Sequence, residues 1–189
     1  ILEVNVQSVA AYLIEQVKAG AQALMIFDTW GGLLPDGWYQ RMSLAAMQKV
    51  IALLPREHEG RKIPVIMFTK GGGIWLNDMA QVGADVIAID WTMRLSRVRK
   101  QLLEINKPLA LQGNLDPLIS FSGPQQIAAA ASGLLDDLAS APTLKPGLHP
   151  LDGHIFNLGH GINQFTPPES VAALSETVIS KSKALRAAK

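Results

Sequence analysis

The sequence predicts an α/β protein in which five strand-helix units follow one leading helix. Three observations support this fold class. Five short apolar runs alternate with longer segments of helical periodicity, the runs are apolar throughout, and glycines and prolines separate the segments. Strands of that kind are typical of parallel sheets that helices cover. The expected strands are residues 23–28, 64–69, 86–90, 109–113 and 154–158.

In the first half of the chain, residues 4–19 place apolar side chains three or four positions apart, which is typical of an amphipathic helix. The run ALMIFD that follows is expected to form a buried first strand. A helix is expected from about residue 37 to 54, where Pro55 ends it, and PVIMFT is a second, buried strand. Residues 74–82 are expected to form a short helix before the third strand, VIAID.

In the second half, residues 93–105 are expected to form a helix with a basic face in water. The side chains assigned to that face are Arg94, Arg97, Arg99 and Lys100. LALQG is the fourth strand. Residues 124–140 begin with proline, which favours a first helical turn, and are rich in alanine and leucine. A loop rich in proline and glycine leads to the fifth strand, and a last helix is expected over residues 168–187.

Composition favours one folded domain that binds a small ligand. The chain has 189 residues, is 48% hydrophobic and 17% charged, and carries a formal net charge of +1. It has no basic block that would predict binding to nucleic acid or to an anionic membrane, and no apolar run of the roughly 18 residues that span a bilayer. The lack of cysteine excludes disulfides and thiolate metal sites and agrees with a cytoplasmic protein.

The number of units favours part of a barrel over a doubly wound sheet. No glycine-rich dinucleotide fingerprint and no phosphate-loop signature follows any expected strand. A (β/α)8 TIM barrel usually needs about 250 residues and eight strands. The chain is therefore expected to form the C-terminal five βα units of such a barrel.

The ends of the expected strands carry the candidate site, because chemistry in these barrels takes place at the carboxyl ends of the strands. Those ends read DTWGG, TKGGG, DWT, QGNLDP and NLGHG. His160, between two glycines, is either presented to a ligand or part of a tight turn. Lys70, beside three glycines, fits a phosphate cradle, a partner for carboxylates or a distant salt bridge. Asn114 and Asp116 are expected to be structural, with Asp116 capping the next turn, and the four tryptophans are expected to pack between helices and sheet.

Together the motifs FDTWGG, FTKGGG, IDWT, LQGNLDP and NLGHG, in this order and spacing, resemble uroporphyrinogen decarboxylase over essentially the whole chain. The resemblance implies a homodimer of single (β/α)8 barrels that removes carbon dioxide from the four acetate side chains of uroporphyrinogen, giving coproporphyrinogen, without cofactor or metal. It also implies that residues 1–189 are the C-terminal part of one barrel domain, with the N-terminal strands and their substrate-binding residues absent.

Three residues fall on functional positions of the family. His160 matches the histidine of the GHG turn, which implies a catalytic residue that binds a substrate carboxylate or organises its pocket. Thr29 matches a position where many members carry a serine hydroxyl that contacts the substrate, and threonine keeps that hydroxyl. Phe27 matches the apolar position beneath the macrocycle. The structural alternatives are a turn histidine, a loop-capping hydroxyl and a core phenylalanine.

Two other functions compete with the one that this resemblance implies. Corrinoid-linked methyltransferases, a related barrel family, bind zinc through a His-x-Cys at the end of the strand that here reads LALQG. Ala110 and Gln112 stand at about those positions, and the chain has no cysteine, so a zinc-thiolate site is excluded. Alternatively, the isolated chain is an inert structural fragment, or a half-barrel that works only with its other half. Without three strands it is expected to be inactive alone.

Overall fold

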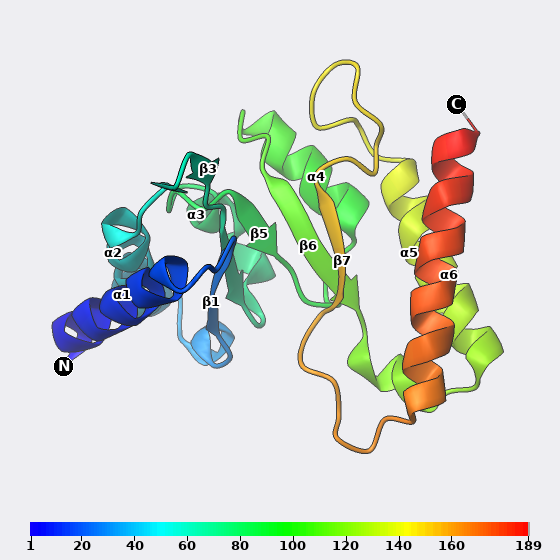
Figure 1. Ribbon diagram of the computed structural model, residues 1–189, viewed down its shortest axis with the longest axis horizontal. Helices are drawn as coiled ribbons and strands as arrows, with labels where there is room; N and C mark the ends of the chain where they lie inside the picture. Colours follow the sequence, from blue (N-terminus) through cyan, green and yellow to red (C-terminus); the bar gives the residue numbers. More distant parts are fainter. Residues whose placement is uncertain (189) are drawn as a thin grey trace. The chain divides into compact units, whose positions relative to one another are not determined.

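The computed structural model describes residues 1–188 and divides into two compact units, Ile1–Ile87 and Ala88–Lys189 (Figure 1). The strands of the main sheet occur in the order β1-β4-β5-β6-β7, which is their order in the sequence. β1 pairs with β4, and β6 with β7, in parallel. A doubly wound sheet reverses its order at a switch point, so this succession confirms the barrel-like α/β fold. The strands are β1 (Leu24–Asp28), β4 (Val65–Thr69), β5 (Val86–Ala88), β6 (Ala110–Leu115) and β7 (His154–Leu158).

In the first unit, α1 (Leu2–Lys18) and α2 (Ala45–Leu53) pack against each other, as Figure 1 shows in blue and cyan. The buried side chains of α1 recur every three or four residues, which confirms the predicted amphipathic helix. All five residues of β4 are buried. That pattern confirms a central strand whose two faces are both covered.

The helix expected over residues 37–54 is one continuous segment but not one α-helix. It begins with the π-helix η2 (Tyr39–Leu44) and continues as α2, which ends ahead of Pro55 as predicted. The short helix expected over 74–82 is instead the 3₁₀ helix η3 (Gly72–Trp75) followed by α3 (Leu76–Met79). Helical periodicity predicts the existence of these elements, but tertiary packing decides how tightly each turn is wound.

A small hairpin in the first unit was not predicted. β2 (Glu57–His58) pairs antiparallel with β3 (Arg61–Lys62). The turn between them places Glu59 and Gly60 at φ 50° and 73°, the left-handed conformation that tight hairpin turns require. Strands of two residues are too short to show any periodicity, so the sequence pattern contains no signal for them.

In the second unit, α4 (Leu95–Glu104) and α5 (Pro124–Ala139) contact β6, and α6 (Pro168–Ala187) runs along α5 (Figure 1). The unexpected 3₁₀ helix η4 (Pro117–Phe121) connects β6 to α5. Asp116 caps it by accepting a hydrogen bond from the backbone nitrogen of Leu118 at 2.9 Å. The capping role predicted for Asp116 is therefore confirmed.

β7 differs from the fully apolar, covered strand that was expected. Ile155 and Asn157 are exposed, whereas His154, Phe156 and Leu158 are half-buried, so burial alternates along the strand. The imidazole of His154 has a structural role, because its Nε2 donates a hydrogen bond to the carbonyl oxygen of Gly113 at 2.8 Å. Burial lowers the pKa of His154, which keeps this imidazole neutral at physiological pH.

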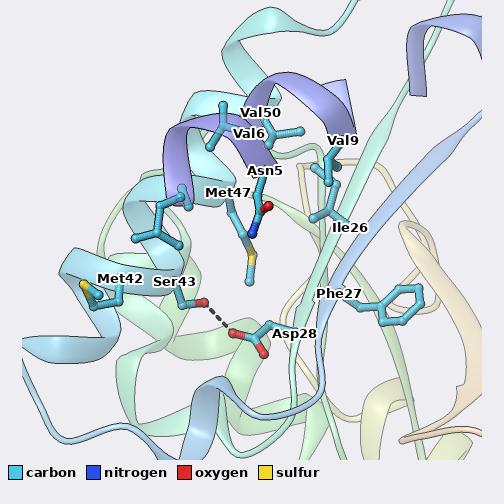
Figure 2. Close-up of a pocket in the computed structure, with 12 residues that line it drawn as sticks. Asn5, Val6, Val9, Ile26, Phe27, Asp28, Met42, Ser43, Met47 and Val50 are labelled. Atoms are coloured by element: carbon cyan, nitrogen blue, oxygen red, sulfur yellow. Dashed lines mark hydrogen bonds between the residues drawn. The ribbon is translucent and has the colours of Figure 1, made fainter. Parts of the chain in front are cut away.

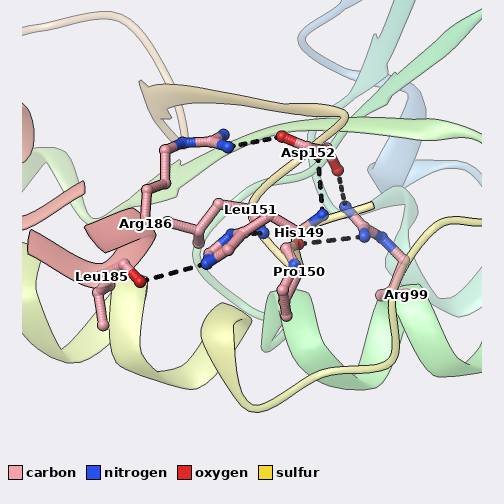
Figure 3. Close-up of polar contacts among 7 residues, drawn as sticks. All are labelled: Arg99, His149, Pro150, Leu151, Asp152, Leu185 and Arg186. Atoms are coloured by element: carbon pink, nitrogen blue, oxygen red, sulfur yellow. Dashed lines mark hydrogen bonds and ion pairs between the residues drawn. The ribbon is translucent and has the colours of Figure 1, made fainter. Parts of the chain in front are cut away.

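The prediction that Arg99 lies on a wet helix face is wrong. Arg99 is 0% exposed and shares the buried side of α4 with Val98 and Leu102. Its Nη1 and Nη2 donate to the carbonyl oxygens of Pro150 and Asp152, each at 3.3 Å (Figure 3). Burial lowers the pKa of the Arg99 guanidinium, and the charge of Asp152 opposes that shift. The buried guanidinium holds the loop that leads into β7.

Arg99 and Arg186 contact the same loop, but replacing each of them is expected to lower the free energy of unfolding by a different amount. Arg186 Nη1 donates to Asp152 Oδ1 at 2.6 Å, but both side chains are partly exposed, and such pairs contribute little (Figure 3). Arg99→Ala removes a fully buried side chain and leaves two carbonyl oxygens without their donor, a loss of about 3 kcal/mol. In urea unfolding of the complete protein, Arg99→Ala should lower stability far more than Arg186→Ala. Equal losses would contradict a buried clamp.

The tryptophans were predicted to pack between helices and sheet, and one of the four does. Trp75 is buried and stacks on Tyr39 with 4.2 Å between ring centroids. Trp30, Trp38 and Trp91 are exposed, so the prediction is wrong for them. Trp30 and Trp91 lie in the loops that follow β1 and β5. None of the helices within residues 1–188 combines the length and apolar character that a membrane crossing needs.

Candidate active site

Phe27 and Asp28 lie at the carboxyl end of β1 and point to opposite sides of the strand. Figure 2 shows Asp28 turned toward Ser43 and Phe27 turned away from it. Ser43 Oγ donates a hydrogen bond to Asp28 Oδ2 at 2.6 Å. Only Leu24 of β1 is buried and Phe27 is 65% exposed. The expectation of a buried first strand and the alternative that Phe27 is a core residue are therefore both wrong. The ring of Phe27 offers an apolar surface at the strand end.

Asp28 also shapes the loop that carries Thr29. Its Oδ1 accepts hydrogen bonds from the backbone nitrogens of Trp30 at 2.9 Å and Gly31 at 2.8 Å, which closes a turn around the half-buried Thr29. A Cβ on Gly31 would lie 2.5 Å from Asp28 Oδ2, so only glycine fits there. Sequence reasoning gave Asp28 no role. An aspartate followed by Thr-Trp-Gly at a strand end is an Asx-turn signal that could have identified it.

The loop after β4 packs closely on the loop after β1, within the first unit. Lys70 donates its backbone N–H to the carbonyl oxygen of Asp28 at 3.1 Å. A Cβ on Gly32 would lie 2.1 Å from the Lys70 carbonyl oxygen, and one on Gly72 would lie 2.9 Å from Thr69 Cβ. Of the glycines beside Lys70, Gly71 packs on Gly32 of the other loop and Gly72 packs on Thr69, so close packing explains both. That explanation removes the main support for a phosphate cradle around Lys70.

Below these loops, a buried hydrogen bond joins Tyr39 Oη to Thr69 Oγ1 at 2.9 Å. Burial raises the pKa of Tyr39 to about 12, which keeps the phenol protonated at physiological pH. The π-helical turn places this tyrosine inside the unit, where it ties η2 to the end of β4. Thr69 directly precedes Lys70, so this hydrogen bond anchors the start of the loop that carries Lys70.

His160 follows β7 in the second unit and lines a pocket with a volume of about 490 Å³. The imidazole is half-buried and can be reached by a ligand. Trp91 and Asp116 contribute an indole and a carboxylate to the same walls. The other side chains that line the pocket are Pro117, Leu118, Ile162 and Asn163. A mostly apolar pocket with a few polar groups is the usual character of a small-molecule site.

The two glycines that flank His160 have different roles. A Cβ on Gly159 would lie 2.7 Å from the backbone nitrogen of Trp91, so this position needs glycine for close packing on the loop after β5. Gly159 N also donates to the carbonyl oxygen of Leu115 at 2.7 Å. A Cβ on Gly161 would meet nothing within 4 Å. The turn is therefore anchored on its Gly159 side.

The loop after β5, on which Gly159 packs, is itself held by hydrogen bonds. Asp90 Oδ1 accepts from the backbone nitrogen of Thr92 at 3.0 Å and from its hydroxyl at 2.5 Å. The buried Asn114, on β6, donates both hydrogens of Nδ2, to the carbonyl oxygens of Asp90 at 2.7 Å and Met93 at 2.6 Å. Sequence reasoning classed Asn114 as structural but could not identify these partners.

The predicted site residues belong to both units. Phe27 and Thr29 lie together after β1 in the first unit, and His160 lies after β7 in the second. Their roles toward a substrate stay predictions. Within residues 1–188, no group of three or more histidine, cysteine, aspartate or glutamate side chains could hold a metal ion.

Comparison with known proteins identifies the family. The family model for uroporphyrinogen decarboxylase (URO-D) matches residues 1–180. Uroporphyrinogen decarboxylase of Burkholderia thailandensis is 54% identical over 186 residues, which are 98% of this chain and 48% of that protein. The protein of the same name in Paraburkholderia phytofirmans is 52% identical over 98% of this chain and 47% of its own length. The chain thus spans about half the length of these relatives.

A solved structure supports the fold. A methyltransferase from Methanosarcina mazei superposes with a TM-score of 0.70 at 19% identity, over 94% of this chain and 48% of that one. Identity this low shows a shared fold and nothing about the reaction. The match to the family model over residues 1–180 is the decisive finding, and the chain belongs to the uroporphyrinogen decarboxylase family.

Proposed function

We propose that residues 1–189 form the C-terminal five βα units of a single uroporphyrinogen decarboxylase barrel. The complete protein is then a carboxy-lyase of haem biosynthesis that converts uroporphyrinogen III to coproporphyrinogen III. The observation that carries this proposal is 54% identity, over 98% of the chain, to a protein named for that activity. The complete enzyme works as a cytoplasmic homodimer and uses no cofactor.

The proposed reaction breaks the bond between each acetate methylene and its carboxyl carbon. A proton is first added to the pyrrole ring, which then accepts the electron pair of the broken bond as carbon dioxide leaves. A proton added to the methylene carbon completes the methyl group, and loss of the ring proton restores the neutral pyrrole. The carboxylate that leaves must lose water, while the other carboxylates of the substrate must be held in place. Preorganised hydrogen-bond donors can meet the second requirement without reorganisation during the reaction.

Two residues of this chain supply such donors in the proposed enzyme. The hydroxyl of Thr29 and an imidazole N–H of His160 bind substrate carboxylates, and the exposed ring of Phe27 packs beneath the macrocycle. All three lie at carboxyl ends of strands or just beyond them, and in a closed (β/α)8 barrel those ends open onto one mouth. The carboxylate of Asp116 would repel an anionic substrate, so its role is limited to capping η4.

Thr29 variants of the complete protein test the proposed contact. Thr29→Ser keeps the hydroxyl, so kcat/KM for uroporphyrinogen should change little. Thr29→Val keeps the shape but leaves the carboxylate without its donor. The expected loss is about 1.5–3 kcal/mol, or roughly 10- to 150-fold in kcat/KM.

Both variants are assayed by coproporphyrinogen formed in the absence of oxygen. If the serine and valine variants were equally active, Thr29 would not bind the substrate. If the unaltered complete protein formed no coproporphyrinogen, the proposed activity itself would be wrong.

A further inference from the structure

We infer that Asn114 and Gly159 are positioning residues for His160, which they fix through the loop of residues 90–93. The inference rests on the proposed function for its meaning, because it assumes that His160 contacts the substrate. It goes further because it assigns a positioning role to two residues that do not themselves contact a ligand. All the contacts that carry it lie within the second unit.

The first step is the amide of Asn114. This side chain is 6% exposed, and its Nδ2 uses both hydrogens, on the carbonyl oxygens of Asp90 and Met93. The two carbonyls bracket the loop that contains Trp91. An amide is the one short side chain that can donate twice from a single atom, whereas a carboxylate of the same size would repel both carbonyls. Asn114 therefore fixes both ends of the loop against β6.

The second step is the packing of the GHG turn on that loop. An added Cβ at Gly159 would lie 2.7 Å from the nitrogen and 2.9 Å from Cε3 of Trp91. The backbone of the turn thus rests directly on Trp91, with no side chain between them. On the other side, Gly159 donates to the carbonyl of Leu115, the residue after Asn114. Any displacement of the loop is passed to His160 without a flexible side chain to absorb it.

The third step is the pocket, in which Trp91 and His160 are both wall residues. The indole comes from the loop after β5 and the imidazole from the turn after β7. The two hydrogen bonds that Asn114 donates to the loop after β5 set the distance between these rings. A misplacement of a binding group by about 1 Å can cost about 100-fold in rate. The structure thus assigns to Asn114 and Gly159 a catalytic effect that acts only through His160.

Variants of the complete protein test this coupling. Asn114→Ala removes both donors. Gly159→Ala keeps the amide of Asn114 and instead pushes on Trp91 and on the backbone of Asp90, so the second variant remains informative if the first fails to fold. Gln125→Ala in the exposed first turn of α5 and Gly133→Ala in the same helix, where an added Cβ meets nothing within 4 Å, are matched controls. Each is made with His160 present and in a His160→Leu background.

With His160 present, Asn114→Ala and Gly159→Ala should each lower kcat/KM for uroporphyrinogen about 10-fold or more, while the controls change it less than about twofold. In the His160→Leu background the same substitutions should have less than about a twofold effect. Equal factors in the two backgrounds would overturn the inference, because they would show action independent of His160.

A second readout needs no substrate. The ring nitrogen resonances of His160, followed by NMR in the substrate-free complete protein, should shift in Asn114→Ala and in Gly159→Ala but not in the controls. Unchanged resonances would refute the positioning role. Shifted resonances in a protein that does not decarboxylate uroporphyrinogen would support positioning and refute the proposed function instead, so the two failures are distinguishable.

Discussion

The 189-residue chain on its own is expected to form no measurable coproporphyrinogen from uroporphyrinogen. It spans about half the length of its relatives, and its sheet has five strands, whereas a closed barrel has eight. The three strand ends that complete the mouth of a closed barrel must then come from the rest of the protein. Orientation of a substrate by groups from several strands lowers the activation barrier by about 7–11 kcal/mol. A chain that holds only part of the site loses most of this contribution.

The measurement compares three samples at equal molar concentration: the complete protein, the isolated chain, and the isolated chain mixed with the separately produced other half. Activity should appear in the first and be absent from the second. Recovery in the third would show that the chain is a half-barrel that works by complementation, and no recovery would favour an inert fragment. Turnover by the isolated chain at a rate comparable to the complete protein would contradict the proposal that the site is shared between the two halves.

Replacing His160 in the complete protein is expected to give the largest loss of any single substitution. His160→Leu removes the donor and leaves a substrate carboxylate desolvated and unpaired, at a cost of about 2–4 kcal/mol, or roughly 30- to 1,000-fold in kcat/KM. The fold should survive, because His160 is only half-buried and projects from a turn into a pocket. His160→Asn retains an N–H donor and should keep part of the activity.

Thermal unfolding of both variants is the control for this prediction. A structural role in the GHG turn would destabilise the two variants equally, with activity falling only in proportion to the folded fraction. A binding role predicts similar melting temperatures and different activities. The valine variant of Thr29 and the leucine variant of His160, which remove the donors, then define how much of the carboxylate binding each strand end supplies.

The strands could be predicted because their residues are locally consistent. All five residues of β4 are apolar or β-branched and are buried, so composition alone predicted the strand. Arg99 shows the limit of this reasoning. It lies on the same side of α4 as Leu95 and Leu102, so helical spacing placed it on the buried side, yet its charge led to a solvent assignment. Its partners are carbonyls about fifty residues away, which no local pattern predicts.

The strand-end motifs of the candidate site could be recognised in the sequence. The contacts that hold their loops in place could not. The GHG turn and Thr29 could be proposed as site residues because their motifs are short and continuous in sequence. The bracket made by Asn114 joins residues separated by 21 and 24 positions, and the close approach of Gly159 to Trp91 joins two different loops. Such contacts depend on how strands pair, which the sequence pattern does not specify.

A crystal structure of the complete protein with bound coproporphyrinogen tests the central claim most directly. The account predicts a product carboxylate oxygen within about 3.2 Å of Thr29 Oγ1, another within about 3.2 Å of a His160 ring nitrogen, and the macrocycle resting on the ring of Phe27. A product whose carboxylates are held at other strand ends, with Thr29 and His160 both out of hydrogen-bond reach, would contradict it.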